Sequence, residues 1–121
     1  IKAFIQTLKA LYPQQFIQVI FQPHLFTRTR DFATEFAASL SIADAVILMD
    51  IYPARELPIA GVTAEIILDK IELENKQLMT TAEILIMLEG QRPDVLATSG
   101  AGSIDALVPE IKEVITKTIA R

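Results

Sequence analysis

The stretch FIQVIFQP, residues 16–23, decides the fold because it is rich in β-branched and aromatic side chains and ends at a proline. A run that is apolar on both faces predicts a strand at the centre of a parallel sheet. A second nearly continuous apolar run, AVILM at residues 45–49, predicts another central strand. DVLAT at 94–98 predicts a further strand, and QLM at 77–79 is a weaker candidate. We therefore expect a core built around several buried strands.

Stretches of helical periodicity separate these strands. Apolar residues recur at helical spacing in residues 2–12 and again in residues 32–40. Thr29 or Asp31 is placed to cap the second of these helices. A shorter helix is predicted at residues 66–71.

Two further helices have recognisable ends. Residues 80–83, Thr-Thr-Ala-Glu, match a capping box and predict the start of a helix that ends at Gly90. The last segment carries apolar side chains along one side of residues 111–119. We expect its helix to start at Pro109, because a proline in a helix interior removes a hydrogen bond.

The alternation of strands and helices with short links is typical of a parallel sheet covered by helices on both faces. Residues 1–121 show no internal repeat, no low-complexity linker and no second domain. We predict one doubly wound α/β domain with a mainly parallel sheet. Ligands of such sheets bind just past the carboxyl ends of the strands, so polar residues at those positions are the first candidates for a site.

Composition excludes several classes of protein. The 121 residues are 51% hydrophobic and carry 15 acidic against 11 basic side chains, a net charge of −4 that disfavours nucleic acid and anionic membranes as partners. The chain has no Cys and one His, which excludes disulfide frameworks and multi-histidine metal sites. No apolar run reaches the ~18 residues of a membrane span. Because the chain opens with Ile1, we expect it to be a piece of a longer protein.

The polar segment after the first strand, residues 22–31, is the strongest candidate site. It holds His24, the only histidine, together with Arg28 and Arg30 beside a predicted helix start. Arginines at that position oppose the helix dipole, which favours a bound anion such as a carboxylate or a phosphate. The alternative is that both arginines are solvated, that His24 is a packed turn residue and that Asp31 caps the helix. Composition alone leaves the two interpretations evenly weighted.

A second polar segment, residues 50–59, follows the second strand. Asp50 and Glu56 are suited to orienting an amine or coordinating Mg²⁺, and Tyr52 is suited to stacking on a ligand. The segment also contains two prolines, which stiffen a ligand loop and a plain connector equally. Taken alone, this segment favours the plain connector.

A third segment, residues 99–104, contains Gly100 and Gly102. Two glycines after a strand let the backbone approach a ligand closely and offer N–H groups to an anion. A tight turn that serves packing explains them at least as well, and Asp105 replaces the third glycine of a dinucleotide fingerprint. The chain also lacks a G-x-x-x-x-G-K-[ST] phosphate loop and a G-x-S-x-G nucleophile motif, so it predicts neither an ATP site of that kind nor a hydrolase triad.

Taken together, the three segments resemble the C-terminal domain of the Mur ligase family. The family carries F-Q-P-H-R-[YF]-T-R-T-R-D, then [DE]-V-Y-P-A-G-E-x-P-I-P-G, then G-A-G-N-I. The corresponding residues here are 21–31, 50–61 and 100–104, in the same order and each after a predicted strand. The resemblance spans essentially the whole chain, and the first motif is the specific one.

The resemblance implies a Rossmann-like domain, residues 1–121, that lacks its first residues. It also implies an N-terminal UDP-sugar domain and a central P-loop ATPase domain outside this chain. The first motif favours the ligase that joins L-alanine to UDP-N-acetylmuramate for peptidoglycan, using ATP and Mg²⁺ in the bacterial cytoplasm. This domain would close over the ATP site and help to bind the amino acid, and the isolated fragment would be inactive and would bind no cofactor tightly.

Carried over position by position, the resemblance assigns roles to residues of all three segments. It implies no catalytic residue and no metal ligand within the fragment alone. Gly100 and Gly102 are implied, weakly, as cofactor-binding residues. The implied substrate-binding residues, with Arg28 the best candidate for a carboxylate, are His24, Thr27, Arg28, Arg30, Tyr52 and Glu56.

The chain departs from the family pattern at several positions. Leu25 stands where the family has an arginine, which removes one candidate carboxylate ligand. Arg55 replaces a glycine, Ala60 replaces a proline and Ser103 replaces an asparagine.

Two other interpretations stay open. The chain is also compatible with a non-catalytic α/β module that binds a small anion or a nucleotide through His24 and Arg28 and the turn at 100–102. Within the family, the alternative is the muropeptide-recycling ligase. The gene sequence upstream of Ile1 distinguishes the module from a ligase, and L-alanine against a tripeptide as acceptor distinguishes the two ligases.

Overall fold

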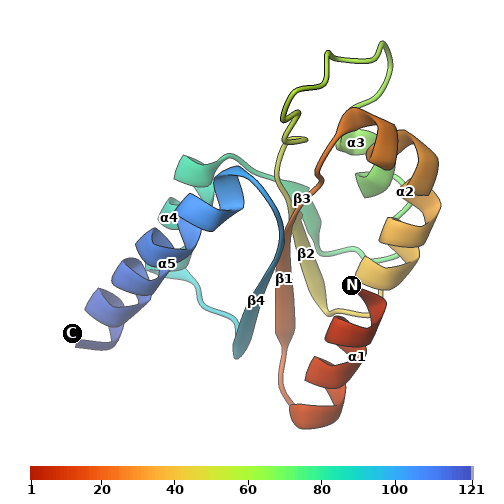
Figure 1. The fold of residues 1–121 in the computed structure, drawn as a ribbon. Helices are drawn as coiled ribbons and strands as arrows, with labels where there is room; N and C mark the ends of the chain where they lie inside the picture. The colour runs from red at the N-terminus through yellow and green to blue at the C-terminus, as the bar shows by residue number, and fades with distance from the viewer. Residues whose placement is uncertain (121) are drawn as a thin grey trace.

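The structure, a computed structural model, describes residues 1–120 of the chain and the side chains of residues 1–117. Strands and helices alternate, as the periodicity predicts (Figure 1). Across these residues no helix is long and apolar enough to cross a membrane. The elements are α1 (Lys2–Leu11), β1 (Ile17–Gln22), α2 (Phe26–Leu40), β2 (Ala45–Leu48), α3 (Glu65–Leu68), β3 (Lys76–Leu78), α4 (Thr81–Gly90), β4 (Val95–Gly100) and α5 (Ser103–Ala120).

The four strands form one parallel sheet in the order β3-β2-β1-β4. The stretch FIQVIFQP supplies β1, which lies between β2 and β4: Val19 is paired with Val46 on one side and with Ala97 on the other. The chain winds from β1 to β2 and β3 in one direction and then returns to the other side of β1. This confirms the predicted doubly wound parallel fold.

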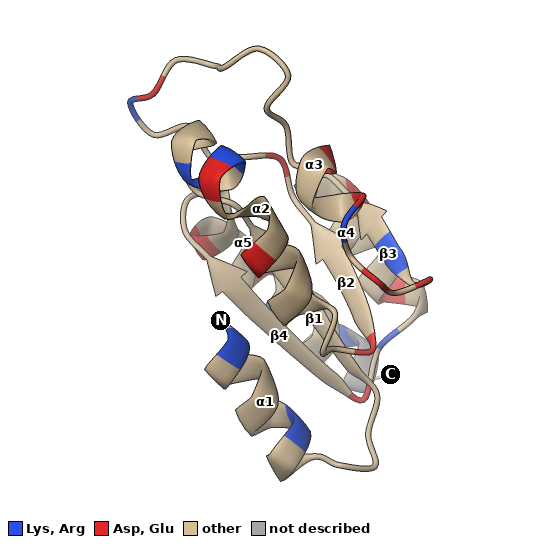
Figure 2. Ribbon diagram, turned by 90° about the vertical axis from the view of Figure 1, so that its right-hand side faces the viewer, with Lys and Arg blue, Asp and Glu red and all other residues tan. Residues whose placement is uncertain are grey.

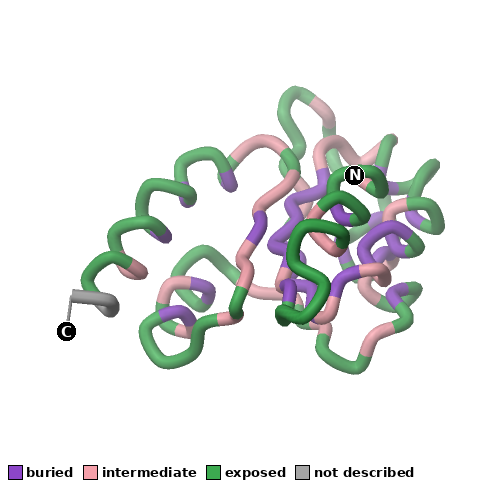
Figure 3. Tube along the Cα trace, turned by 90° about the horizontal axis from the view of Figure 1, so that it is seen from below, coloured by how far each residue is buried: buried purple, intermediate pink, exposed green. Residues whose placement is uncertain are grey.

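Helices cover both faces of the sheet (Figure 1). On one face, α1, α2 and α3 pack their apolar residues against Val19 and Phe21. On the other face, α4 and α5 pack against Ile20 and Ile47. Buried residues follow the strands and the inner sides of the helices (Figure 3), and the charged residues lie on the helices, the loops and β3 (Figure 2).

The capping box is confirmed in both directions. The Thr80 hydroxyl accepts from the Glu83 N–H at 3.2 Å, and the Glu83 carboxylate accepts from the Thr80 N–H at 2.9 Å. The helix that it opens, α4, ends at Gly90, as predicted.

Two predicted helix starts are wrong. Helix α2 begins at Phe26, and neither Thr29 nor Asp31 caps it: Thr29 is buried in the first turn and its hydroxyl donates to the Leu25 carbonyl. The predicted start near residue 32 coincides instead with a kink at Phe32, where φ is −121° and ψ is 18°.

Helix α5 begins at Ser103, and Pro109 lies inside it. Ile104, Leu107 and Ile111 are all buried against the sheet. The packing of these side chains outweighs the single backbone hydrogen bond that the proline removes.

At the amino ends of the strands, two carboxylates bind N–H groups at the start of β1 and just before it. Asp44 accepts from the Ile17 N–H at 2.8 Å and forms an ion pair with Lys9 of α1 at 2.8 Å. Asp94 accepts from the Phe16 N–H at 2.9 Å. These contacts fix α1, β1 and the segment before β4 to one another.

Candidate functional site

Three of the loops that leave the sheet at its carboxyl edge lie together there. They are residues 23–25 after β1, residues 49–64 after β2 and residues 101–102 after β4. The first two continue side by side beyond the sheet, because the Leu25 N–H donates to the Tyr52 carbonyl at 2.9 Å and the Tyr52 N–H donates to the Pro23 carbonyl at 2.8 Å. The topology therefore gathers all three predicted segments at one edge.

The aromatic residues of two segments meet above a glycine of the third. The His24 and Tyr52 rings are stacked, with centroids 6.0 Å apart and planes 16° apart. Gly102 lies under Tyr52 with φ of 108°, and a Cβ there would collide with Cγ of the ring. Gly100 is equally confined, because a Cβ would collide with the Gln22 carbonyl oxygen. Packing thus explains why glycine is required at both positions. Their predicted contact with a cofactor stays a prediction.

Glu56 and Thr27 bind each other. The Glu56 carboxylate accepts from the Thr27 N–H at 3.1 Å and from the Thr27 hydroxyl at 2.5 Å. These bonds, with the hydroxyl contributing most, hold the pKa of Glu56 below its ordinary value. Leu25 at the N-cap position supplies no side-chain bond, so Glu56 caps α2 from a different loop.

The two arginines have different surroundings. Arg30 forms an exposed ion pair with Asp31 at 2.8 Å, which raises the pKa of Arg30 and lowers that of Asp31. The Arg28 guanidinium lies over the Phe32 ring, 5.8 Å from its centroid, and among residues 1–120 it has no acidic partner. The charge of Arg28 is therefore available to a ligand.

The structure brings most of the predicted substrate-binding residues into one cluster. His24 contacts Tyr52, Thr27 contacts Glu56, and the charge of Arg30 contributes to the lowered pKa of Glu56. Arg28 lies one residue beyond Thr27 in the first turn of α2. In the described part of the chain no three His, Asp or Glu side chains gather closely enough to hold a metal ion.

One residue of the site was not predicted. Gln22, the last residue of β1, is buried and bonds to the backbone of the loop after β2 and of the first turn of α5. A signal was present in the sequence, because a glutamine at the end of an otherwise apolar central strand requires buried hydrogen-bond partners.

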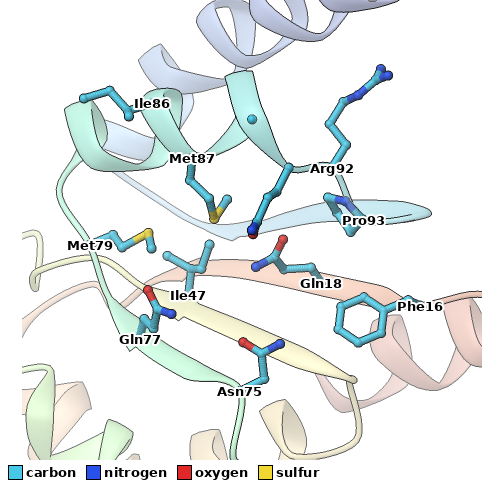
Figure 4. A pocket seen from close by; sticks show the side chains of 12 residues that line it. Phe16, Gln18, Ile47, Asn75, Gln77, Met79, Ile86, Met87, Arg92 and Pro93 are labelled. Atoms are coloured by element: carbon cyan, nitrogen blue, oxygen red, sulfur yellow. The ribbon is translucent and has the colours of Figure 1, made fainter.

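A pocket of about 530 Å³ lies away from this cluster, beside the end of α4 (Figure 4). It extends over the sheet from the amino ends of β1 and β3 to Ile47 and Met79. Its floor is apolar, with Ile47, Met79 and Met87, and the Gln18 side chain points into it. None of the predicted site residues lines this pocket. The pocket is therefore separate from the cluster at the carboxyl edge.

Comparison with known proteins identifies the family of the chain. No family model matches the chain. A UDP-N-acetylmuramate–L-alanine ligase of Parabacteroides distasonis is 49% identical over 97% of the chain. The corresponding ligases of Flavobacterium johnsoniae and Porphyromonas gingivalis are 44% and 50% identical over 98% and 92% of the chain. By this similarity the chain belongs to the Mur ligase family.

The chain spans about a quarter of the length of these relatives, 25–26% of each. The resemblance inferred from the three motifs is therefore confirmed. The similarity extends over the cluster at the carboxyl edge and over the core that supports it.

Proposed function

We propose that this chain is the C-terminal domain of a Mur ligase that joins L-alanine to UDP-N-acetylmuramate in peptidoglycan synthesis. The observation that carries the proposal is the identity of 44–50% to ligases with that name over nearly the whole chain. The gathering of the three motif segments at the carboxyl edge supports it, because ligands of doubly wound sheets bind there. On this proposal the ligase works in the bacterial cytoplasm.

The reaction would form an amide between the lactyl carboxylate of the UDP-sugar and the amine of L-alanine. ATP, with Mg²⁺, would phosphorylate that carboxylate and release ADP, and attack by the amine on the acyl phosphate would then release phosphate. The parts of the ligase outside this chain would hold ATP and Mg²⁺. Such chemistry depends mostly on positioning and on stabilisation of negative charge. The contribution of this domain would be to bind the amino acid and to close the cleft over the reacting groups.

Within the cluster, the residues divide into those that reach a ligand and those that shape the edge. Arg28 would hold the carboxylate of L-alanine, since its guanidinium has no acidic partner here. His24 and Tyr52 would form the neighbouring wall, with Arg30 adding positive charge at the rim. Thr27 and Glu56 would fix the start of α2, from which Arg28 extends.

The test is turnover by the full-length protein that carries this chain. With ATP, Mg²⁺, UDP-N-acetylmuramate and L-alanine, we expect amide product and stoichiometric ADP, and no product from residues 1–121 alone. Replacing L-alanine by a tripeptide acceptor is the control, and we expect it to abolish product. Product with the tripeptide in place of L-alanine would assign the chain to the muropeptide-recycling ligase. Turnover by residues 1–121 alone, or none by the full-length protein, would overturn the proposal.

A further inference from the structure

Gln22 is 4% exposed and ends the central strand β1 at the carboxyl edge. Its side-chain carbonyl accepts from the Ile104 N–H at 2.8 Å, and its side-chain amide donates to the Asp50 carbonyl at 3.1 Å. One partner is in the first turn of α5 and the other begins the loop after β2. A single side chain thus links the end of β1 to the loop after β2 and to the start of α5.

The orientation of this carboxamide is fixed by its partners. An N–H can only donate and a backbone carbonyl can only accept, so the two ends of the amide cannot be exchanged. The Ile104 N–H belongs to the first turn of a helix and has no partner within that helix. Without Gln22, that N–H and the Asp50 carbonyl would lose these partners beside the buried end of β1.

The backbone of Gln22 adds a further contact to the same loops. Gln22 is paired with Gly100 across β1 and β4, and the glycine lies too close to the Gln22 carbonyl for any side chain. Gly100 leads directly to Gly102, on which Tyr52 packs. The position of the Tyr52 ring beside His24 therefore depends on where Gln22 holds the turn after β4.

Gln18 shows that a glutamine in this strand does not by itself create such a link. It lies four residues earlier in β1 on the same face of the sheet, since side chains alternate along a strand. Its side chain points into the pocket at the amino ends of the strands (Figure 4) and makes no hydrogen bond with any described residue. Gln18 is therefore a matched control.

We propose that Gln22 is a positioning residue. It holds the three loops in the arrangement in which Arg28, His24 and Tyr52 contact the same ligand. This inference rests on the proposed function. Gln22 itself touches no substrate. It acts through the Asp50 carbonyl and the Ile104 N–H, which set the loop that carries Tyr52 and the turn beneath it.

The test compares Gln22→Met with Gln18→Met in the full-length ligase. Methionine matches the length of glutamine but can replace neither hydrogen bond. We expect Gln22→Met to raise the KM for L-alanine about tenfold, the effect of losing one to two buried hydrogen bonds, with a smaller change in the KM for ATP. Gln18→Met is expected to change neither KM by more than about twofold.

Gln22→Glu separates positioning from packing. An ionised carboxylate still accepts from the Ile104 N–H but repels the Asp50 carbonyl, whereas the protonated form donates to it. Relative to the unaltered enzyme, the KM of Gln22→Glu for L-alanine should improve as the pH is lowered. A merely structural role would give no such recovery, and if Gln22→Met does not fold, this pH profile carries the test.

Equal KM values for L-alanine in Gln22→Met, Gln18→Met and unaltered ligase would overturn the inference. So would a Gln22→Glu profile parallel to that of the unaltered enzyme. In residues 1–121, Gln22→Met should shift the amide NMR signals of Tyr52, Gly102 and Ile104, and Gln18→Met should leave them in place. If the full-length protein does not use L-alanine, the proposed function fails. Unchanged NMR signals in Gln22→Met would then also show that Gln22 does not position these loops.

Discussion

The two edges of the sheet are held by side-chain hydrogen bonds of different kinds. At the amino edge, Asp44 accepts from the first N–H of β1 and Asp94 from the N–H of the residue before it, so both carboxylates fix the start of that strand. At the carboxyl edge, Gln22 joins the end of β1 to the loop after β2 and to the start of α5, and Glu56 joins that loop to the start of α2. The bonds at the amino edge hold the start of β1, whereas those at the carboxyl edge hold the loop after β2 in position relative to its neighbours.

Backbone conformation separates the two edges as well. Among residues 1–120, every residue with positive φ lies at the carboxyl edge, either in one of these loops or, for Gly100, at the end of β4: Leu25, Ala54, Gly61, Gly100 and Gly102. Such conformations are unfavourable for residues other than glycine and persist where surrounding contacts impose them. The carboxyl edge therefore has a specified geometry, which agrees with its proposed role in binding.

Gly102→Ala should break the carboxyl edge and gives the largest expected loss of stability. The new Cβ would collide with Tyr52, and alanine is strained at a φ of 108°. We expect the free energy of unfolding to fall by about 2–4 kcal/mol, with displacement of the Tyr52 ring. Gly61→Ala is the control, because it has a φ of 79° but open space around it, and should cost about 1 kcal/mol. Chemical denaturation measures both, and equal losses would show that Tyr52 does not pack on Gly102.

Asp44→Asn should alter the amino edge and leave the carboxyl edge unchanged. Burial acts to raise the pKa of Asp44, but its bonds to Lys9 and the Ile17 N–H outweigh burial and lower it below 3.8. A lowered folded-state pKa stabilises the fold above the ordinary carboxyl value, and this contribution is lost as the pH falls through the folded value.

We expect Asp44→Asn to cost about 1 kcal/mol at neutral pH and to reduce the fall in stability below pH 3.8. Urea denaturation across acid pH measures this. The KM of the full-length ligase for L-alanine should not change. A raised KM would show that the amino edge also serves the site.

The fold could be predicted from the sequence where local signals agree with packing. Signals within a few neighbouring residues predict the structure of three segments: the apolar run of β1, the strand at 45–49 and the capping box at Thr80. Parallel topology then follows from alternation, and it places the motif segments at one edge without any long-range information.

The predictions failed where a distant residue decides a local structure. Helix α2 starts at Phe26 because Glu56, far along the chain, accepts from its first turn. Helix α5 starts before Pro109 because Gln22 accepts from Ile104 and the sheet buries its apolar side. A sequence pattern shows cap residues close by, but it does not show partners that only folding brings near. For the same reason, the hydrogen bonds of Gln22 to Asp50 and Ile104 could not be predicted from the sequence.

The central claim is that the carboxyl edge, and not the amino edge, serves the ligand. Arg28→Ala and Arg92→Ala in the full-length ligase test it most directly, because both arginines are exposed but Arg92 lines the pocket at the amino ends of the strands. The account predicts that Arg28→Ala lowers kcat/KM for L-alanine by about tenfold or more, the loss of a charge-assisted hydrogen bond, and that Arg92→Ala changes it by less than about twofold. Unchanged kinetics for Arg28→Ala, or an equal loss for Arg92→Ala, would contradict it.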